Sequence, residues 1–99
     1  MMKVPKTIKI AGHTLTVRRQ KHLRSQGEAF ALFDPETLEI VIDSSVKGTL
    51  LWESIWHEVL EALNFFCEAG LEHKSIQVMG MLLQQIVEGI VEGEEDDTV

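Results

Sequence analysis

The chain has 99 residues and a formal net charge of -7 at pH 7, and 44% of its residues are hydrophobic. This length predicts one domain with a modest core, and the hydrophobic content is ordinary for a globular protein. No apolar run could span a membrane or act as a signal peptide, and the single cysteine, Cys67, excludes an internal disulfide. We therefore expect a protein of a reducing compartment, the cytoplasm.

The two signs of charge are separated along the chain. Residues 1–24 contain seven of the nine Lys and Arg and no acid, whereas residues 25–99 contain all sixteen Asp and Glu. The basic segment has no aromatic residue that could stack on bases, so nucleic acid is not an expected partner. We expect the segment to be attracted to the acidic body of the protein or to a second copy.

The first predicted strands are Thr7–Ile10 and Thr14–Val17, where polar and apolar residues alternate. The turn residues Ala11-Gly12-His13 lie between them, so this segment predicts a half-buried β-hairpin. Residues 18–27 are polar, basic and without periodicity, and we expect a loop there.

A second hairpin is predicted from residues 29–33 and 38–42, which are joined by Asp34-Pro35-Glu36-Thr37. Aspartate suits the first position of a type I turn and proline the second. In the later strand the side chains alternate between two faces. Leu38, Ile40 and Ile42 point to one face, and Glu39, Val41 and Asp43 point to the other. One face of the sheet is therefore expected to be covered and the other mostly solvated.

Two helices are predicted downstream, because the apolar residues then recur at helical spacing. The first is expected over residues 49–67, with Gly70 ending it and Leu71 making the apolar contact of a Schellman cap. The second is expected over residues 74–91.

The predicted fold class is α+β: a small antiparallel sheet of two N-terminal hairpins packs on two C-terminal helices. Residues 1–91 would form this single domain, and residues 92–99 are predicted to be an acidic, disordered tail. Val78, Met81 and Val87 make the apolar arc of the second helix wider than one neighbour needs, which predicts a homodimer.

A polar stripe runs along the first predicted helix. At about 100° per residue, one narrow face collects Glu53, His57, Glu61, Asn64 and Glu68. Such a stripe is ordinarily the solvated face of an amphipathic helix. This helix contains no Lys or Arg, and carboxylates around a histidine without a basic partner suit a bound cation.

His57 and Glu61 lie one helical turn apart, with Cβ atoms about 5–6 Å from each other. An imidazole and a carboxylate at this spacing can bind one zinc ion or another divalent metal. Glu58 would lie beside the metal, where a general base that activates water is needed. His73 is the predicted third ligand, because the N-terminal end of a helix favours the neutral imidazole that a metal requires.

The register of the two helices decides whether His73 reaches the other ligands. In a straight antiparallel helical hairpin, His73 would lie on the order of 9 Å along the axis from Glu61. Gly80 would face Glu61 in that register, and Gln84 would face His57. The predicted site therefore requires that the helices cross steeply or that residues 68–72 fold back.

Residues 56–64, Trp-His-Glu-Val-Leu-Glu-Ala-Leu-Asn, and residues 71–76, Leu-Glu-His-Lys-Ser-Ile, resemble a group of short proteins from phages and mobile elements. These look like minimal zincin-type metallopeptidases, distantly similar to the SprT-like and ImmA/IrrE-like peptidases. The resemblance covers roughly residues 28–91. It implies a small antiparallel sheet, a His-Glu helix and a further helix that supplies a ligand.

The resemblance also implies that His57 is a zinc ligand and Glu58 the general base. Glu61 stands where these peptidases have their second histidine, which makes the site harder and more anionic. We expect a zincin-like protein that binds a divalent metal and hydrolyses a peptide bond. Its predicted site comprises the ligands His57, Glu61 and His73, the base Glu58, and Asn64 and Gln77 just outside the ligands.

The alternative function is that of a non-enzymatic phage accessory protein that dimerises through the second helix and binds a protein partner. Under either hypothesis the partner is a peptide or protein, and a phage-encoded chain would act in the cytoplasm of a bacterial host. Metal content distinguishes the two.

Overall fold

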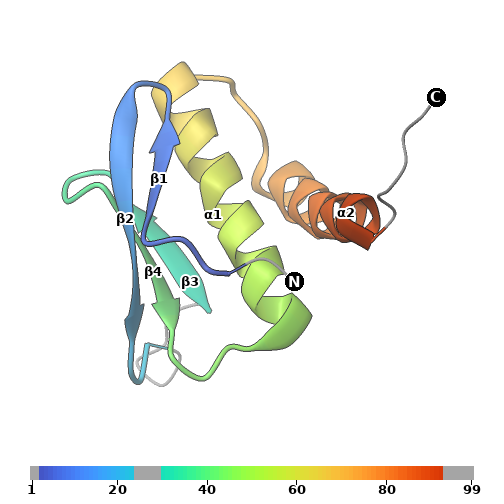
Figure 1. Ribbon diagram of the computed structural model, residues 1–99. Coiled ribbons are helices and arrows are strands. Elements are labelled where there is room, and N and C mark those ends of the chain that lie inside the picture. The colour runs from blue at the N-terminus through green and yellow to red at the C-terminus, as the bar shows by residue number, and fades with distance from the viewer. Residues whose placement is uncertain (1–2, 24–29, 93–99) are drawn as a thin grey trace.

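The computed structural model describes residues 3–23 and 30–92. The predicted tail falls largely outside this part of the chain. The described elements are, in chain order, β1 (Thr7–Ile10), β2 (His13–Gln20), β3 (Ala31–Asp34), β4 (Glu39–Asp43), α1 (Gly48–Cys67) and α2 (His73–Glu92). Figure 1 shows α1 between the sheet on one side and α2 on the other. The α+β fold class is confirmed. No described helix is long and apolar enough to cross a membrane.

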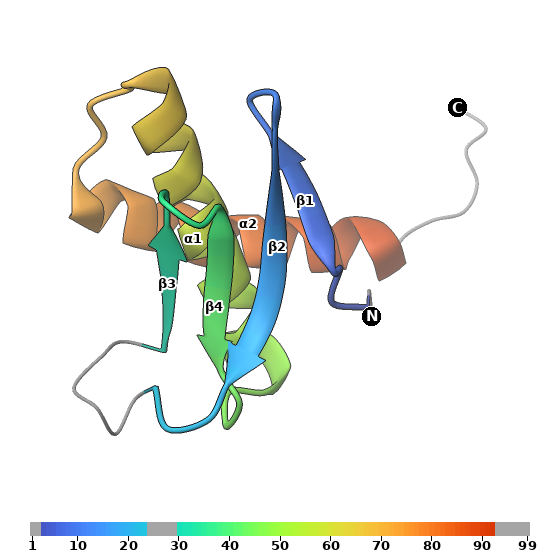
Figure 2. The same cartoon turned by 90° about the vertical axis from the view of Figure 1, so that its left-hand side faces the viewer.

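The sheet has the strand order β1-β2-β4-β3. Both predicted hairpins are present, since β1 pairs antiparallel with β2 and β3 pairs antiparallel with β4. The expectation of a wholly antiparallel sheet is wrong, because β2 and β4 run parallel (Figure 2). This order puts the most apolar strand, β4, in the interior of the sheet, where neighbours on both sides cover its backbone.

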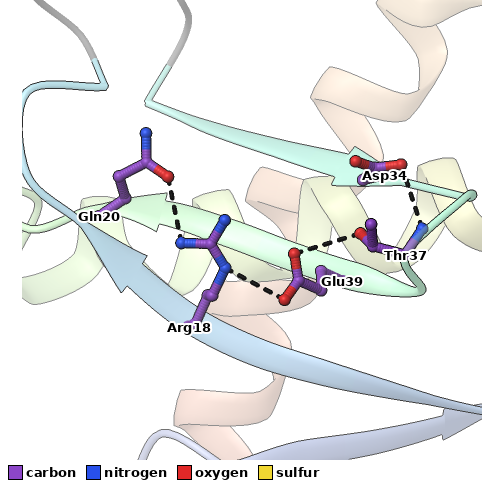
Figure 3. A network of polar contacts seen from close by, with 5 residues as sticks. All are labelled: Arg18, Gln20, Asp34, Thr37 and Glu39. Atoms are coloured by element: carbon purple, nitrogen blue, oxygen red, sulfur yellow. Dashed lines mark hydrogen bonds and ion pairs between the residues drawn. The ribbon is translucent and has the colours of Figure 1, made fainter.

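The parallel pairing also explains why β2 is longer than predicted. It continues through Arg18 and Arg19 to Gln20, residues for which a loop was expected, because all three pair with β4. Figure 3 shows the side chains at this pair: Arg18 Nε of β2 donates to Glu39 Oε2 of β4 over 3.1 Å. Thr37 Oγ1, in the turn before β4, donates to Glu39 Oε1 over 3.2 Å. Polarity alone did not reveal this strand because its partner is far away in the sequence.

The apolar core lies between the sheet and α1. Leu15, Ile40 and Ile42 from the sheet are fully buried and belong to one cluster with Trp52 and Ile55 of α1. Trp52 is therefore a core residue.

The second face of β4 is less solvated than expected, since Val41 and Asp43 are each only 3% exposed. Asp43 ends the strand: its Oδ1 accepts hydrogen bonds from the backbone N–H and the hydroxyl of Ser45, at 2.8 and 2.7 Å. Arg19 Nη2 donates to the carbonyl oxygens of Asp43 and of Val46, which holds the segment between β4 and α1. Central position in the sheet thus buries residues that alternation alone assigned to solvent.

Helix α1 ends at Cys67, and the left-handed residue at its C-terminus is Glu68 with φ 51°, so the predicted cap at Gly70 is wrong. The backbone N–H groups of Glu68 and Ala69 both reach the carbonyl oxygen of Asn64. The helix therefore ends at Cys67, as its periodicity predicted, and residues 68–72 connect it to α2.

That connection runs back along α1. The Asn64 side chain binds both backbone groups of Leu71 in this connection. Its Oδ1 accepts from the Leu71 N–H over 2.8 Å, and its Nδ2 donates to the Leu71 carbonyl oxygen over 3.2 Å. α2 then crosses α1 steeply, as the two views in Figures 1 and 2 show. Gly80 lies against His57, not Glu61, so the straight-hairpin register does not occur.

Candidate metal centre

Three potential ligands converge where α2 begins beside α1. Glu61 Oε2 lies 3.3 Å from His57 Nε2 and 3.1 Å from His73 Nδ1. One donor atom from each of the three residues lies within 4.8 Å of the other two, so the group could hold a metal ion. The two imidazole rings meet edge to face, with centroids 5.0 Å apart.

Each of these positions has a local cause. His57 and Glu61 share one face of α1 because they are four residues apart, and the helix presents them side by side. His73 is the first residue of α2, and the clamped connection returns it to the level of Glu61. The steep crossing and folded-back segment that the site required are both present.

The spacing of the donors fits a small divalent ion. Ligand atoms about 2.0–2.2 Å from one tetrahedral zinc lie roughly 3.4 Å from each other. The distances of 3.3 and 3.1 Å to Glu61 Oε2 are close to that value. They equally suit imidazole N–H groups that donate to one carboxylate, so the geometry fits both a metal site and a metal-free cluster.

Electrostatics favour the form of His57 that a metal needs. Burial of its ring, together with the neighbouring His73, lowers the pKa of His57 below its usual value, although Glu61 opposes this. The imidazole is consequently neutral at neutral pH, with a nitrogen lone pair available to a cation.

Glu58 is the most unusual carboxyl group of the site. It is only 7% exposed. Burial, with a smaller contribution from the Glu61 charge, raises the pKa of Glu58 to about 7. A carboxyl group with this pKa exchanges a proton readily near neutral pH.

A pocket of about 250 Å³ opens beside these residues. His57, Glu58 and His73 form one part of its wall, and Phe30, Ala31, Leu50, Glu53, Ser54, Gln77 and Met81 form the rest. No local sequence pattern connects the apolar residues of the wall, because they come from separate parts of the chain.

Asn64 and Gln77 occupy different places around the group. Asn64 acts on His73 through the connection, because its amide bonds the backbone of Leu71. Gln77 lies one helical turn beyond His73 and lines the pocket. Gln84, only 5% exposed, lies another turn beyond Gly80 on the buried face of α2.

Comparison of the chain with protein-family models, with curated proteins and with solved structures finds no match.

Proposed function

We propose that this protein binds one divalent metal ion, preferably zinc, through His57, Glu61 and His73, and that it hydrolyses a peptide bond in the adjoining pocket. The observation that carries the proposal is the convergence of two imidazoles and one carboxylate beside the buried carboxyl group of Glu58. Neither feature follows from an ordinary solvated helix face, where such groups would extend into water.

Two histidines and one carboxylate are a known ligand set of catalytic zinc sites, with further coordination positions left for water and substrate. Glu61 in place of a second helical histidine is therefore compatible with catalysis. Its charge makes the site more anionic and so extends the choice of metal toward harder ions.

The chain's own residues have separate roles in the proposed reaction. A bound metal would supply Lewis acidity toward the substrate carbonyl. Glu58 would accept a proton from the attacking water and return it to the leaving amine. The apolar wall of the pocket, which includes Leu50 and Met81, would hold a neighbouring side chain of the substrate.

Metal analysis tests the first step most directly. Untagged protein, purified without chelator and then offered zinc, should contain about one zinc per chain, and Glu58→Gln should retain it. A content near zero in the wild-type protein would refute the metal proposal and leave a hydrogen-bonded cluster. The protein would then be a candidate binding module, a role that the exposed apolar face of α2 favours.

A further inference from the structure

The exposed apolar residues of α2 face away from α1. The helix buries Ile76, Gly80 and Gln84 against its neighbour, at a spacing of four residues. On the rest of the helix five large apolar side chains are 41–67% exposed: Val78, Met81, Leu82, Ile86 and Ile90. Since this helix lies outside α1 in Figure 1, the sheet does not cover it.

The outward surface has the form of a ridge beside a groove. Val78, Leu82, Ile86 and Ile90 follow each other at intervals of four, and such a row is a ridge on a helix surface. The adjacent row passes through Met81 and Gln85 to Gly89, and a β-carbon at Gly89 would meet no atom within 4 Å. A glycine inside a helix costs about 1 kcal/mol relative to alanine, and packing among the described residues gives no reason for it.

Charge makes this face suitable for a second copy of the same chain. The protein carries a net charge of -7, so most contacts between two copies would bring like charges together. Among the exposed residues described on α2, Lys74 has a fixed charge and none is a carboxylate; Glu88 is half-buried. Among the described residues, this face therefore brings no exposed acid opposite its copy.

We propose that the ridge of α2 packs into the groove of α2 in a second copy, around a two-fold axis. Rows of four-residue spacing interdigitate at roughly -50°, and Gly89 would let the partner ridge approach closely. A two-fold contact uses the same patch twice and closes on itself, which ends association at the dimer. Because Met81 belongs both to this face and to the pocket wall, the second copy would border the candidate active site.

Sedimentation of the full-length protein across a range of micromolar concentrations tests the proposal. The wild-type chain should be a dimer at tens of micromolar, and Ile86→Glu should be a folded monomer, because a charge at the centre of the face cannot be buried there. Phe65→Glu is the matched control: Phe65 is also exposed, at 56%, but lies on α1, and the variant should remain dimeric. Circular dichroism confirms that each variant is folded.

Gly89→Ala separates this arrangement from other uses of the same face. If the partner ridge packs at Gly89, the added methyl group should weaken dimerisation at least several-fold. In the Ile86→Glu monomer the same change should raise the thermal midpoint, because alanine favours the helix. A monomeric wild-type chain, or a dimer that persists in Ile86→Glu, would overturn the proposal.

Discussion

Gly80 of α2 lies directly against the backbone of His57 in α1. A β-carbon at Gly80 would lie 3.2 Å from the backbone nitrogen of His57 and 3.3 Å from its Cα, closer than β-carbons usually approach other atoms. The absence of a side chain thus allows the two helices to cross at the histidine. This crossing leaves His57 and Glu61 of the polar stripe half-buried and gives the candidate site its second wall.

A larger residue at the crossing should separate the helices. We expect Gly80→Leu to destabilise the protein by about 2 kcal/mol, because the neighbouring backbone cannot yield to the extra atoms. Zinc affinity should fall as well, since His73 moves with α2. Urea unfolding and a zinc titration measure the two effects. Ser75→Leu, at an exposed position of the same helix, is the control and should change neither by much.

Removal of His73 should weaken metal binding more than removal of any exposed neighbour. We expect His73→Ala to reduce zinc affinity by at least about 100-fold, more than the loss of a group that merely orients a ligand. Lys74→Ala is the matched control at the adjacent exposed position. Competition with a chromophoric chelator gives both affinities. Equal affinities would remove His73 from the ligand set and leave His57 and Glu61 with a different third group.

Loss of the Asn64 amide should act on the metal through the chain connection. Asn64→Ala removes two hydrogen bonds to Leu71, which should cost roughly 1–2 kcal/mol of stability. The freed connection would hold His73 less firmly, so zinc affinity should fall by about 10–100-fold. Cys67→Ala, an exposed change on the last turn of the same helix, provides the comparison. Unchanged affinity in Asn64→Ala would show that His73 is positioned by α2 alone.

The buried carboxyl group of Glu58 should make the metal-free protein less stable as pH rises. Its pKa is 4.5 in an unfolded chain and about 7 in the fold, so the folded state binds the proton more tightly. This contribution to stability is complete below about pH 4.5 and is lost as pH rises through about 7. The full difference is on the order of 3 kcal/mol.

Glu58→Gln removes that dependence. Relative to wild type, it should therefore gain stability between about pH 5 and pH 8 in the presence of a chelator. Denaturant unfolding at both pH values measures the difference, and the lowered pKa of His57 cancels because both proteins share it. Glu36→Gln, in an exposed turn, controls for the loss of one negative charge. A constant difference across this range would mean that Glu58 stays ionised in the fold.

The same substitution tests catalysis. Glu58→Gln should retain zinc and lose hydrolysis of an unstructured protein substrate such as casein, with a loss of at least about 100-fold. Amide and carboxylate have nearly the same shape, but only the carboxylate accepts the proton of the attacking water. Hydrolysis that persists in the zinc-loaded variant would exclude Glu58 as the general base.

Local patterns in the sequence determined most of the secondary structure. Alternation predicted the strand at Thr7–Ile10, and helical periodicity predicted α1 to within one residue at its start. The same periodicity put His57 and Glu61 side by side, because a four-residue separation has one geometry in any helix. These features depend on neighbours in the chain, so the sequence contains them directly.

Tertiary structure decided the rest, because each remaining feature joins residues that are distant in the chain. The parallel pairing with β4 turned Arg18 into a strand residue, and tertiary packing around α1 buried Glu58 and raised the pKa of its carboxyl group. The meeting of His73 with Glu61 required both the left-handed turn at Glu68 and the hydrogen bonds of Asn64 that return the chain. Sequence spacing could identify these residues as candidate ligands, but only the packing of α2 on α1 could bring them together.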